Sequence, residues 1–186
     1  MREDIKNACN VMAKGGVILY PTDTVWGLGC DAANPEAVSR VYEIKQRTDN
    51  KPMLVLVDMP PKVMLYAGEI PNIAWDLIDM VENPLTIIYP EARNLAPNLL
   101  AEDGSVGIRV TREKFSSQLC QRFRKAIVST SANRSGQPAP ANFSEVSEEI
   151  KSLVDYVVTY RQKEMNNPAP SNIIKLDKGG VFKIIR

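Results

Sequence analysis

Residues 15–32, GGVILYPTDTVWGLGCDA, contain strand and turn signals from which the fold can be predicted. The apolar run VILY (17–20) lies between a glycine pair and a proline, which predicts a short buried strand. The segment PTDTVWGLGCDA (21–32) combines threonines with glycines and predicts a turn-rich connection close to strand ends. Upstream, residues 4–13 place apolar side chains at helical spacing, and the glycine pair is expected to end that helix.

Further helix and strand signals run from this stretch to residue 186. Asn34, Pro35 and Glu36 supply a cap, a first helical residue and an acid, which predicts a helix from here to about Gln46. Further helices are expected over 73–81, 113–124 and 144–153, and strands over 53–57, 85–89, 105–110, 126–130, 154–160, 171–176 and 181–186. Because helices and strands alternate without the beat of a doubly wound sheet, the sequence predicts one α/β domain over residues 1–186.

Composition excludes several classes of site. The 186 residues include no histidine, so neither a Ser-His-Asp triad nor a zinc site with imidazole ligands can form. The three cysteines are odd in number and far apart, which argues against a disulfide framework and predicts buried or half-buried thiols. With 23 Lys and Arg against 22 Asp and Glu, a basic site must be built locally by a few cations.

The N-terminal sixteen residues predict no targeting segment. They are charged and amphipathic, without the apolar core of a signal peptide. Apolar runs elsewhere are too short to span a bilayer. We therefore expect a cytoplasmic protein without a membrane partner.

Four clusters could carry chemistry, and each also has a plainer structural interpretation. Residues 21–32 could be an ordinary turn around a core Trp26. The cations Lys45, Arg47 and Lys51 could hold phosphate or could simply favour a helix C-terminus. The run Ser129–Asn133 follows an apolar strand and could bind phosphate or cap its own turn, but it lacks the spacing of a P-loop.

The fourth cluster is the strand SVGIRV (105–110). Strand alternation places Ser105, Gly107 and Arg109 on one face, with the apolar residues on the other. This alternation predicts that Ser105 and Arg109 turn together toward a surface, which could be a binding face or merely solvent.

In this order and spacing, PTDTVWGLG, KQR with a trailing lysine, PLTIIY, SVGIRV and STSANRSGQPAP resemble the YrdC/YciO family over nearly the whole chain. The resemblance implies a twisted mixed sheet with flanking helices and a basic concave face. It also implies an L-threonylcarbamoyladenylate synthase. Such an enzyme joins L-threonine, bicarbonate or CO2 and ATP, accompanied by Mg2+, into threonylcarbamoyl-AMP and pyrophosphate. Downstream tRNA-modification proteins would use the product.

The resemblance also implies a role for individual residues. Thr24, Arg109, Ser129 and Ser171 match positions that contact threonine. The positions that match the nucleotide site are Lys45, Arg47, Lys51, Ser105, Ser131, Asn133 and Arg186, and Lys45 and Arg47 are expected to act in catalysis. A magnesium ion could be held by ATP alone or also by Asp23 or Asp31, which turn capping explains equally well.

Two alternatives stay open at this point. The sequence departs from the synthase pattern at Thr48, Leu56 and Asn172, and it stops at Arg186, which leaves a YciO-like paralogue as one alternative. The other is a module that binds tRNA or double-stranded RNA on a basic concavity, although the balanced charge disfavours it.

Overall fold

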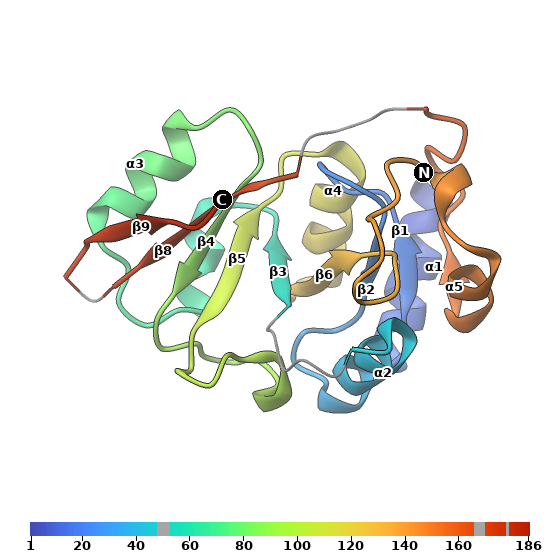
Figure 1. The fold of residues 1–186 in the computed structure, drawn as a ribbon, viewed down its shortest axis with the longest axis horizontal. Helices are drawn as coiled ribbons and strands as arrows, with labels where there is room; N and C mark the ends of the chain where they lie inside the picture. The colour runs from blue at the N-terminus through green and yellow to red at the C-terminus, as the bar shows by residue number, and fades with distance from the viewer. Residues whose placement is uncertain (48–52, 166–169, 178) are drawn as a thin grey trace.

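A mixed sheet forms the centre of the protein. The computed structural model describes residues 1–47, 53–165, 170–177 and 179–186. In this part of the chain the strand order is β7-β1-β2-β6-β3-β5-β4-β8-β9 (Figure 1). The strands are β1 (Ile18–Tyr20), β2 (Gly27–Gly29), β3 (Leu54–Val57), β4 (Leu85–Tyr89), β5 (Val106–Val110), β6 (Ile127–Ser131), β7 (Tyr156–Val157), β8 (Asn172–Leu176) and β9 (Phe182–Ile184).

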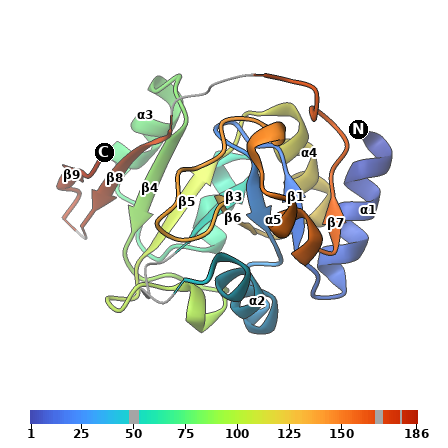
Figure 2. The ribbon, with the colours of Figure 1, turned by 45° about the vertical axis from the view of Figure 1, so that its right-hand side comes forward.

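Helices flank the sheet, as predicted. The α-helices are α1 (Arg2–Ala13), α2 (Pro35–Lys45), α3 (Asn72–Met80), α4 (Lys114–Phe123) and α5 (Glu148–Leu153), and the 3-10 turns are η1 (Pro60–Leu65), η2 (Pro97–Leu99) and η3 (Phe143–Glu145). Helix α1 packs against α4 and β1, and α4 packs against β3 (Figure 2). The predicted start of α2 is confirmed, since the Asn34 side chain accepts hydrogen bonds from the backbone N–H groups of Glu36 and Ala37.

Pairing in the middle of the sheet brings distant segments together. Strand β3 pairs in parallel with β5, with Leu56 opposite Arg109, and antiparallel with β6. Strand β6 also pairs with β2, and Gly27 lies opposite Ser131. The loop after β1, the end of β5 and the end of β6 therefore converge on one region of the sheet.

Three sequence predictions need correction, and the first concerns β2. Residues 27–29 were expected within a turn, yet they form a strand between β1 and β6. A Cβ on Gly29 would lie 2.6 Å from the Tyr20 ring and 3.0 Å from the Val128 carbonyl oxygen. The glycine therefore permits a close strand approach rather than a turn.

The other two corrections shorten predicted elements. The strand expected over 154–160 pairs only at Tyr156 and Val157, because the Asp4 carboxylate takes the backbone N–H of Thr159 at 2.8 Å. The helix expected over 144–153 is divided into η3 and α5, because Ser147 caps the start of α5 by accepting from the N–H of Ile150.

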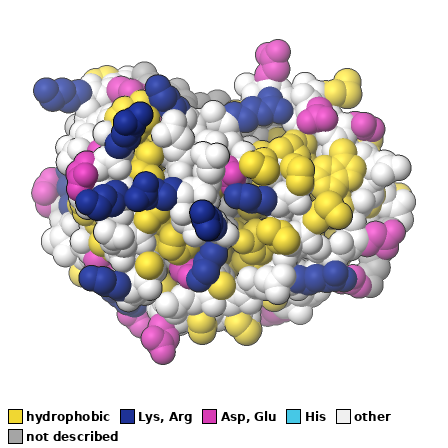
Figure 3. All heavy atoms as spheres, turned by 180° about the vertical axis from the view of Figure 1, so that it is seen from behind, with side chains coloured by type: hydrophobic (Ala, Val, Ile, Leu, Met, Phe, Trp, Pro, Cys, Tyr) yellow, Lys and Arg dark blue, Asp and Glu magenta, His cyan; other side chains and the backbone are white. Residues whose placement is uncertain are grey.

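The surface opposite the view of Figure 1 distributes charged and apolar groups unevenly. Most Lys and Arg side chains lie on the left half and across the middle of that face, and the largest group of hydrophobic side chains lies on the right half, where some cations also lie (Figure 3). Exposed hydrophobic residues include Met64 and Leu65 of η1 and Met80 of α3. Cys30 and Cys120 are buried and Cys9 is half-buried, as predicted. Among the described residues, none of the helices has the length and apolar character needed to cross a membrane.

Candidate functional site

A cavity of about 340 Å³ opens where the sheet segments converge. Among its described lining residues are three arginines and no aspartate or glutamate, which makes it a site for anions. The predicted site residues that line it are Thr24, Arg47, Arg109, Ser129, Ser131, Ser171 and Arg186. The structure thus places residues from six separate elements and loops around one hollow.

Arg109 is the most constrained side chain of the cavity. It is 4% exposed, and β5 holds its backbone between β3 and β4. The guanidinium donates from Nε to Thr86 Oγ1 at 3.2 Å, from Nη1 to Asp23 Oδ1 at 2.6 Å and to Thr24 Oγ1 at 3.2 Å, and from Nη2 to Ser171 Oγ at 3.0 Å. These contacts fix the plane of the guanidinium group, which is the geometry that carboxylate recognition requires.

The predicted threonine contacts therefore lie together. Thr24 and Ser171 both touch Arg109, and Ser129 lies on the neighbouring wall of the cavity. Gly27 forms part of that wall, where a Cβ would lie 3.1 Å from the Thr130 carbonyl oxygen. The absence of a side chain at Gly27 keeps the hollow open beside the hydroxyl groups.

Lys45 lies at the C-terminal end of α2 and is only 3% exposed. Its Nζ donates to the carbonyl oxygens of Ser131 at 2.5 Å and Asn133 at 2.8 Å. In return, the N–H of Ser135 donates to the Lys45 carbonyl at 2.8 Å. Burial, with a smaller effect of the nearby Arg47 cation, lowers the pKa of Lys45 to about 8.

Through these hydrogen bonds, Lys45 connects the C-terminal end of α2 to the loop after β6. Its ammonium is used inside the protein rather than on the cavity wall, so its predicted contact with ATP stays a prediction. Arg134 adds a second connection between this loop and α2, because its Nη1 donates to the Ile44 carbonyl at 2.9 Å; its Nη2 pairs with Glu149. These connections fix the end of α2 and so position Arg47, which follows the helix, at the cavity.

The other residues predicted to contact the nucleotide differ in where they lie and in what they contact. Arg186 lines the cavity, and its Nε donates to the Ser171 carbonyl at 3.2 Å. Asn133 donates its amide N–H groups to the carbonyls of Arg134 and Gln137, while its buried Oδ1 has no partner among the described residues. Lys51 and Thr48 lie outside the described residues.

Ser105 lies away from the others. It precedes β5, at the end of the strand opposite Arg109, and its Oγ donates to Asp103 Oδ1 at 2.5 Å. Asp103 in turn pairs with Lys175 at 2.6 Å, and hydrogen bonds from Lys175 and Ser105 lower its pKa to about 2. Ser105 does not line the cavity, and its predicted contact with ATP stays untested.

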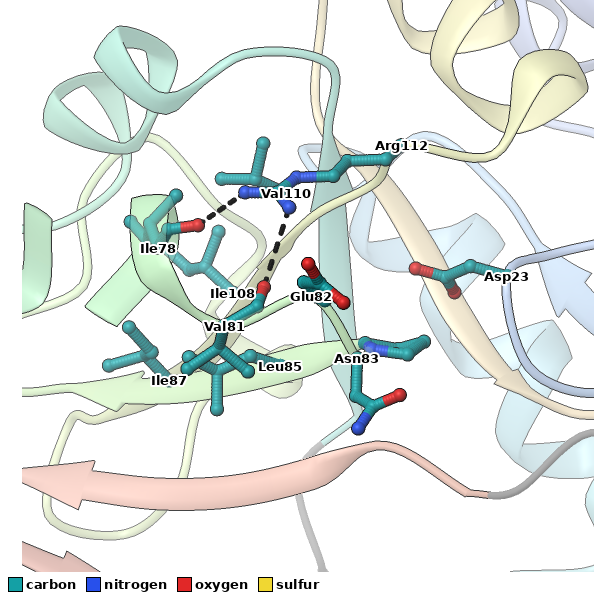
Figure 4. A pocket seen from close by; sticks show the side chains of 11 residues that line it. Asp23, Ile78, Val81, Glu82, Asn83, Leu85, Ile87, Ile108, Val110 and Arg112 are labelled. Atoms are coloured by element: carbon teal, nitrogen blue, oxygen red, sulfur yellow. Dashed lines mark hydrogen bonds between the residues drawn. The ribbon is translucent and has the colours of Figure 1, made fainter. Parts of the chain in front are cut away.

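A smaller pocket of about 100 Å³ adjoins the Arg109 site (Figure 4). Aliphatic side chains of α3, β4 and β5 form most of its wall, and Asp23, Glu82 and Arg112 contribute charged groups. Arg112 donates from Nη2 to the Ile78 carbonyl at 2.5 Å, at the C-terminal end of α3, and from Nη1 to the Val81 carbonyl at 3.4 Å. Asp23 therefore lies between the pocket and Arg109 of the main cavity.

Sequence reasoning missed the partners of Arg109. Thr86 was seen only as part of an apolar strand, and Asp23 only as a turn residue or a metal ligand. The proposed metal role fits poorly, since Asp23 pairs with Arg109 and Asp31 pairs with Lys125, each at 2.6 Å. The described residues contain no group of three or more His, Cys, Asp or Glu that could hold a metal ion.

Comparisons with known proteins agree with one another. The Sua5_yciO_yrdC family model, described as Telomere recombination, matches residues 10–186. The protein named threonylcarbamoyl-AMP synthase in Pseudoalteromonas translucida (strain TAC 125) is 35% identical over 182 residues, which cover 96% of each chain.

Solved structures share the fold. P. abyssi Sua5 complexed with L-threonine has a TM-score of 0.85 at 24% identity over 98% of this chain. That match covers 53% of Sua5, so the present chain spans about half its length. E. coli YciO has a TM-score of 0.86 at 23% identity, and the match covers 100% of this chain and 89% of YciO.

Proposed function

Because this chain belongs to the Sua5/YciO/YrdC family, which matches residues 10–186, we propose that it is an L-threonylcarbamoyladenylate synthase. It joins L-threonine, bicarbonate or CO2 and ATP into threonylcarbamoyl-AMP and pyrophosphate. The name of the 35% identical relative and the L-threonine bound to P. abyssi Sua5 support this activity. The alternative of a nucleic-acid module has no specific support in the geometry of the cavity.

One observation carries the proposal. The cavity presents a buried, planar guanidinium surrounded by the hydroxyl groups of Thr24, Thr86 and Ser171, next to two further arginines. Arg109 can take the carboxylate of an amino acid, and hydroxyl groups can orient the rest of a small polar substrate. Arg47 and Arg186 can face the phosphates of ATP from the same hollow.

The chemistry fits a protein without histidine. The neutral amine of threonine adds to CO2 and loses a proton, and the resulting carbamate oxygen attacks the α-phosphorus while pyrophosphate leaves. Two anions must be held together, and charge on the phosphate oxygens must be neutralised. Arginine side chains and fixed hydroxyl groups supply both effects without a general base of neutral pKa.

We further propose that Mg2+ arrives on the phosphates of ATP. No aspartate or glutamate is among the described residues that line the cavity, whereas a protein-held Mg2+ normally uses at least one carboxylate. The ion would supply charge neutralisation at the phosphates, and the chain would supply arginines around them. A cytoplasmic location and transfer of the product to tRNA by other proteins complete the proposal.

Pyrophosphate release tests this function. With ATP, bicarbonate and L-threonine, the protein should release pyrophosphate, and omission of threonine should abolish the release. Arg47→Ala should slow it strongly, while Arg122→Ala, a change of an exposed arginine on α4, should leave it unchanged. Equal pyrophosphate release with and without threonine would refute the proposed substrate.

A further inference from the structure

Asp23 occupies the guanidinium that the proposed substrate needs. Its Oδ1 accepts from Arg109 Nη1 at 2.6 Å, and the two side chains are 12% and 5% exposed. All three nitrogens of the Arg109 guanidinium donate to an acceptor, and Asp23 is the only charged acceptor among the described residues. A buried arginine without a counter-ion would be costly, and Asp23 balances its charge.

A second carboxylate on Arg109 would conflict with Asp23. A substrate carboxylate binds a guanidinium best through two parallel hydrogen bonds, and these need two adjacent donors. Nη1 is already shared by Asp23 and Thr24, so a forked contact that uses Nη1 requires Asp23 to yield its place. Two carboxylates held side by side in a buried site would also repel each other.

Space for a displaced Asp23 lies next to it. Its side chain faces the 100 Å³ pocket, and Figure 4 shows it on the side opposite the end of α3. Arg112 lines the same pocket together with Glu82; its two Nη atoms donate to the Val81 and Ile78 carbonyls, and each carries a second N–H group. Among the described residues, Asp23 Oδ2 has no hydrogen-bond partner, so only the Oδ1 contact must break.

The backbone around Asp23 does not need to move. Thr22 is 4% exposed, and its Oγ1 accepts from the N–H of Thr24 at 3.1 Å and donates to the Val25 carbonyl at 2.8 Å. This turn fixes the chain on both sides of Asp23. A rotation of one side chain is therefore sufficient to exchange its partner.

We infer that Asp23 competes with the substrate carboxylate for Arg109, and that the substrate displaces it into the neighbouring pocket. This inference rests on the proposed function and adds a specificity-determining residue to it. A ligand with a carboxylate replaces the charge that Asp23 withdraws. An analogue with an uncharged amide in place of the carboxylate, such as L-threoninamide, cannot, so Asp23 restricts the site to ligands with a carboxylate.

Asp23→Asn tests the inference, with Asp76→Asn as the matched control. Both changes replace one aspartate by asparagine, but only Asp23 touches Arg109, whereas Asp76 is exposed on α3. We expect Asp23→Asn to bind L-threonine about tenfold more tightly in calorimetry, because a neutral amide competes less for a guanidinium than a carboxylate does. Asp76→Asn should leave threonine affinity unchanged.

A crystal structure of the unaltered protein with L-threonine provides a second measurement that does not depend on a variant. The inference predicts the threonine carboxylate on Arg109 and the loss of the Asp23–Arg109 hydrogen bond. Unchanged or weaker threonine binding in Asp23→Asn, or an intact ion pair in the complex, would overturn it and leave the synthase activity standing. If the unaltered protein bound no threonine, both this inference and the proposed function would fail.

Discussion

Replacing Arg109 with lysine keeps the positive charge of the cavity and removes the planar fork. In the structure the guanidinium reaches Asp23, Thr24, Thr86 and Ser171 from three separate nitrogens. A lysine ammonium presents its donors from one atom, so it cannot serve all four acceptors. We expect it to keep the ion pair and to lose the contacts on the far side of the group.

The loss can be estimated from the contacts. A hydrogen bond to a charged group contributes about 1.5–3 kcal/mol, so removal of one arm of the fork should weaken threonine binding roughly tenfold to a hundredfold. The free energy of unfolding should fall by less than the loss of several Arg109 hydrogen bonds suggests. Thr86 and Ser171, which would lose Arg109 as a partner, already lie within hydrogen-bond distance of each other at 3.2 Å.

Calorimetric titration of Arg109→Lys with each ligand separates the two halves of the cavity. Threonine affinity should fall by this factor, and ATP affinity should change little because Arg47 and Arg186 remain. Arg122→Lys, a change of an exposed arginine on α4, is the control and should bind both ligands as before. An equal loss for both ligands, or no loss for either, would refute the assignment of Arg109 to the substrate carboxylate.

Three further outcomes follow from buried charges. Lys45→Met should lower the free energy of unfolding, by about 1–3 kcal/mol for each buried carbonyl that loses its partner, and should weaken ATP binding; urea titration and calorimetry measure both. The pKa of Lys45 is about 8 in the folded protein, against 10.5 ordinarily, so the unfolded chain binds more protons between these two pH values. The free energy of unfolding of the unaltered protein should therefore rise with pH in this range relative to that of Lys45→Met. A difference between the two proteins that does not change with pH would contradict this. Burial raises the pKa of Asp4, but hydrogen bonds from Thr159 and Tyr156 outweigh this effect and hold the pKa below 3.8. Ionised Asp4 therefore stabilises the folded protein above pH 3.8, and this stabilisation is lost as the pH falls through the lower pKa of the folded state. In an acid titration, Asp4→Asn should lack this loss of stability.

Local chemistry made much of the fold predictable. Asn34 and Pro35 specify the start of α2 within a few residues, and Gln46 ends the helix in the left-handed conformation at a φ of 49°. Strand β2 was not predictable, because glycines usually indicate turns. Only the neighbouring strand, with the Tyr20 ring and the Val128 carbonyl close by, explains why glycine stands at Gly29.

Seven residues that the sequence singles out line the cavity, whereas their contacts could not be predicted from the sequence. Alternation along β5 correctly separates Arg109 from the apolar residues, but it cannot show that Ser105 lies at the far end of the strand. The Asp23–Arg109 pair joins residues 86 apart in the sequence, so only the tertiary fold reveals it. Lys45 illustrates the same limit, because a cation at a helix end can point to a ligand or to carbonyls of its own chain.

Isotope labelling of the product tests the proposed synthase activity. The protein should be incubated with ATP, L-threonine and 13C-bicarbonate, and the nucleotide products analysed by mass spectrometry. We expect threonylcarbamoyl-AMP with one 13C atom in its carbamoyl group, and loss of this product in the variant Arg109→Lys at low threonine concentration. Hydrolysis of ATP without any adenylate that contains both threonine and the labelled carbon would contradict the proposed activity.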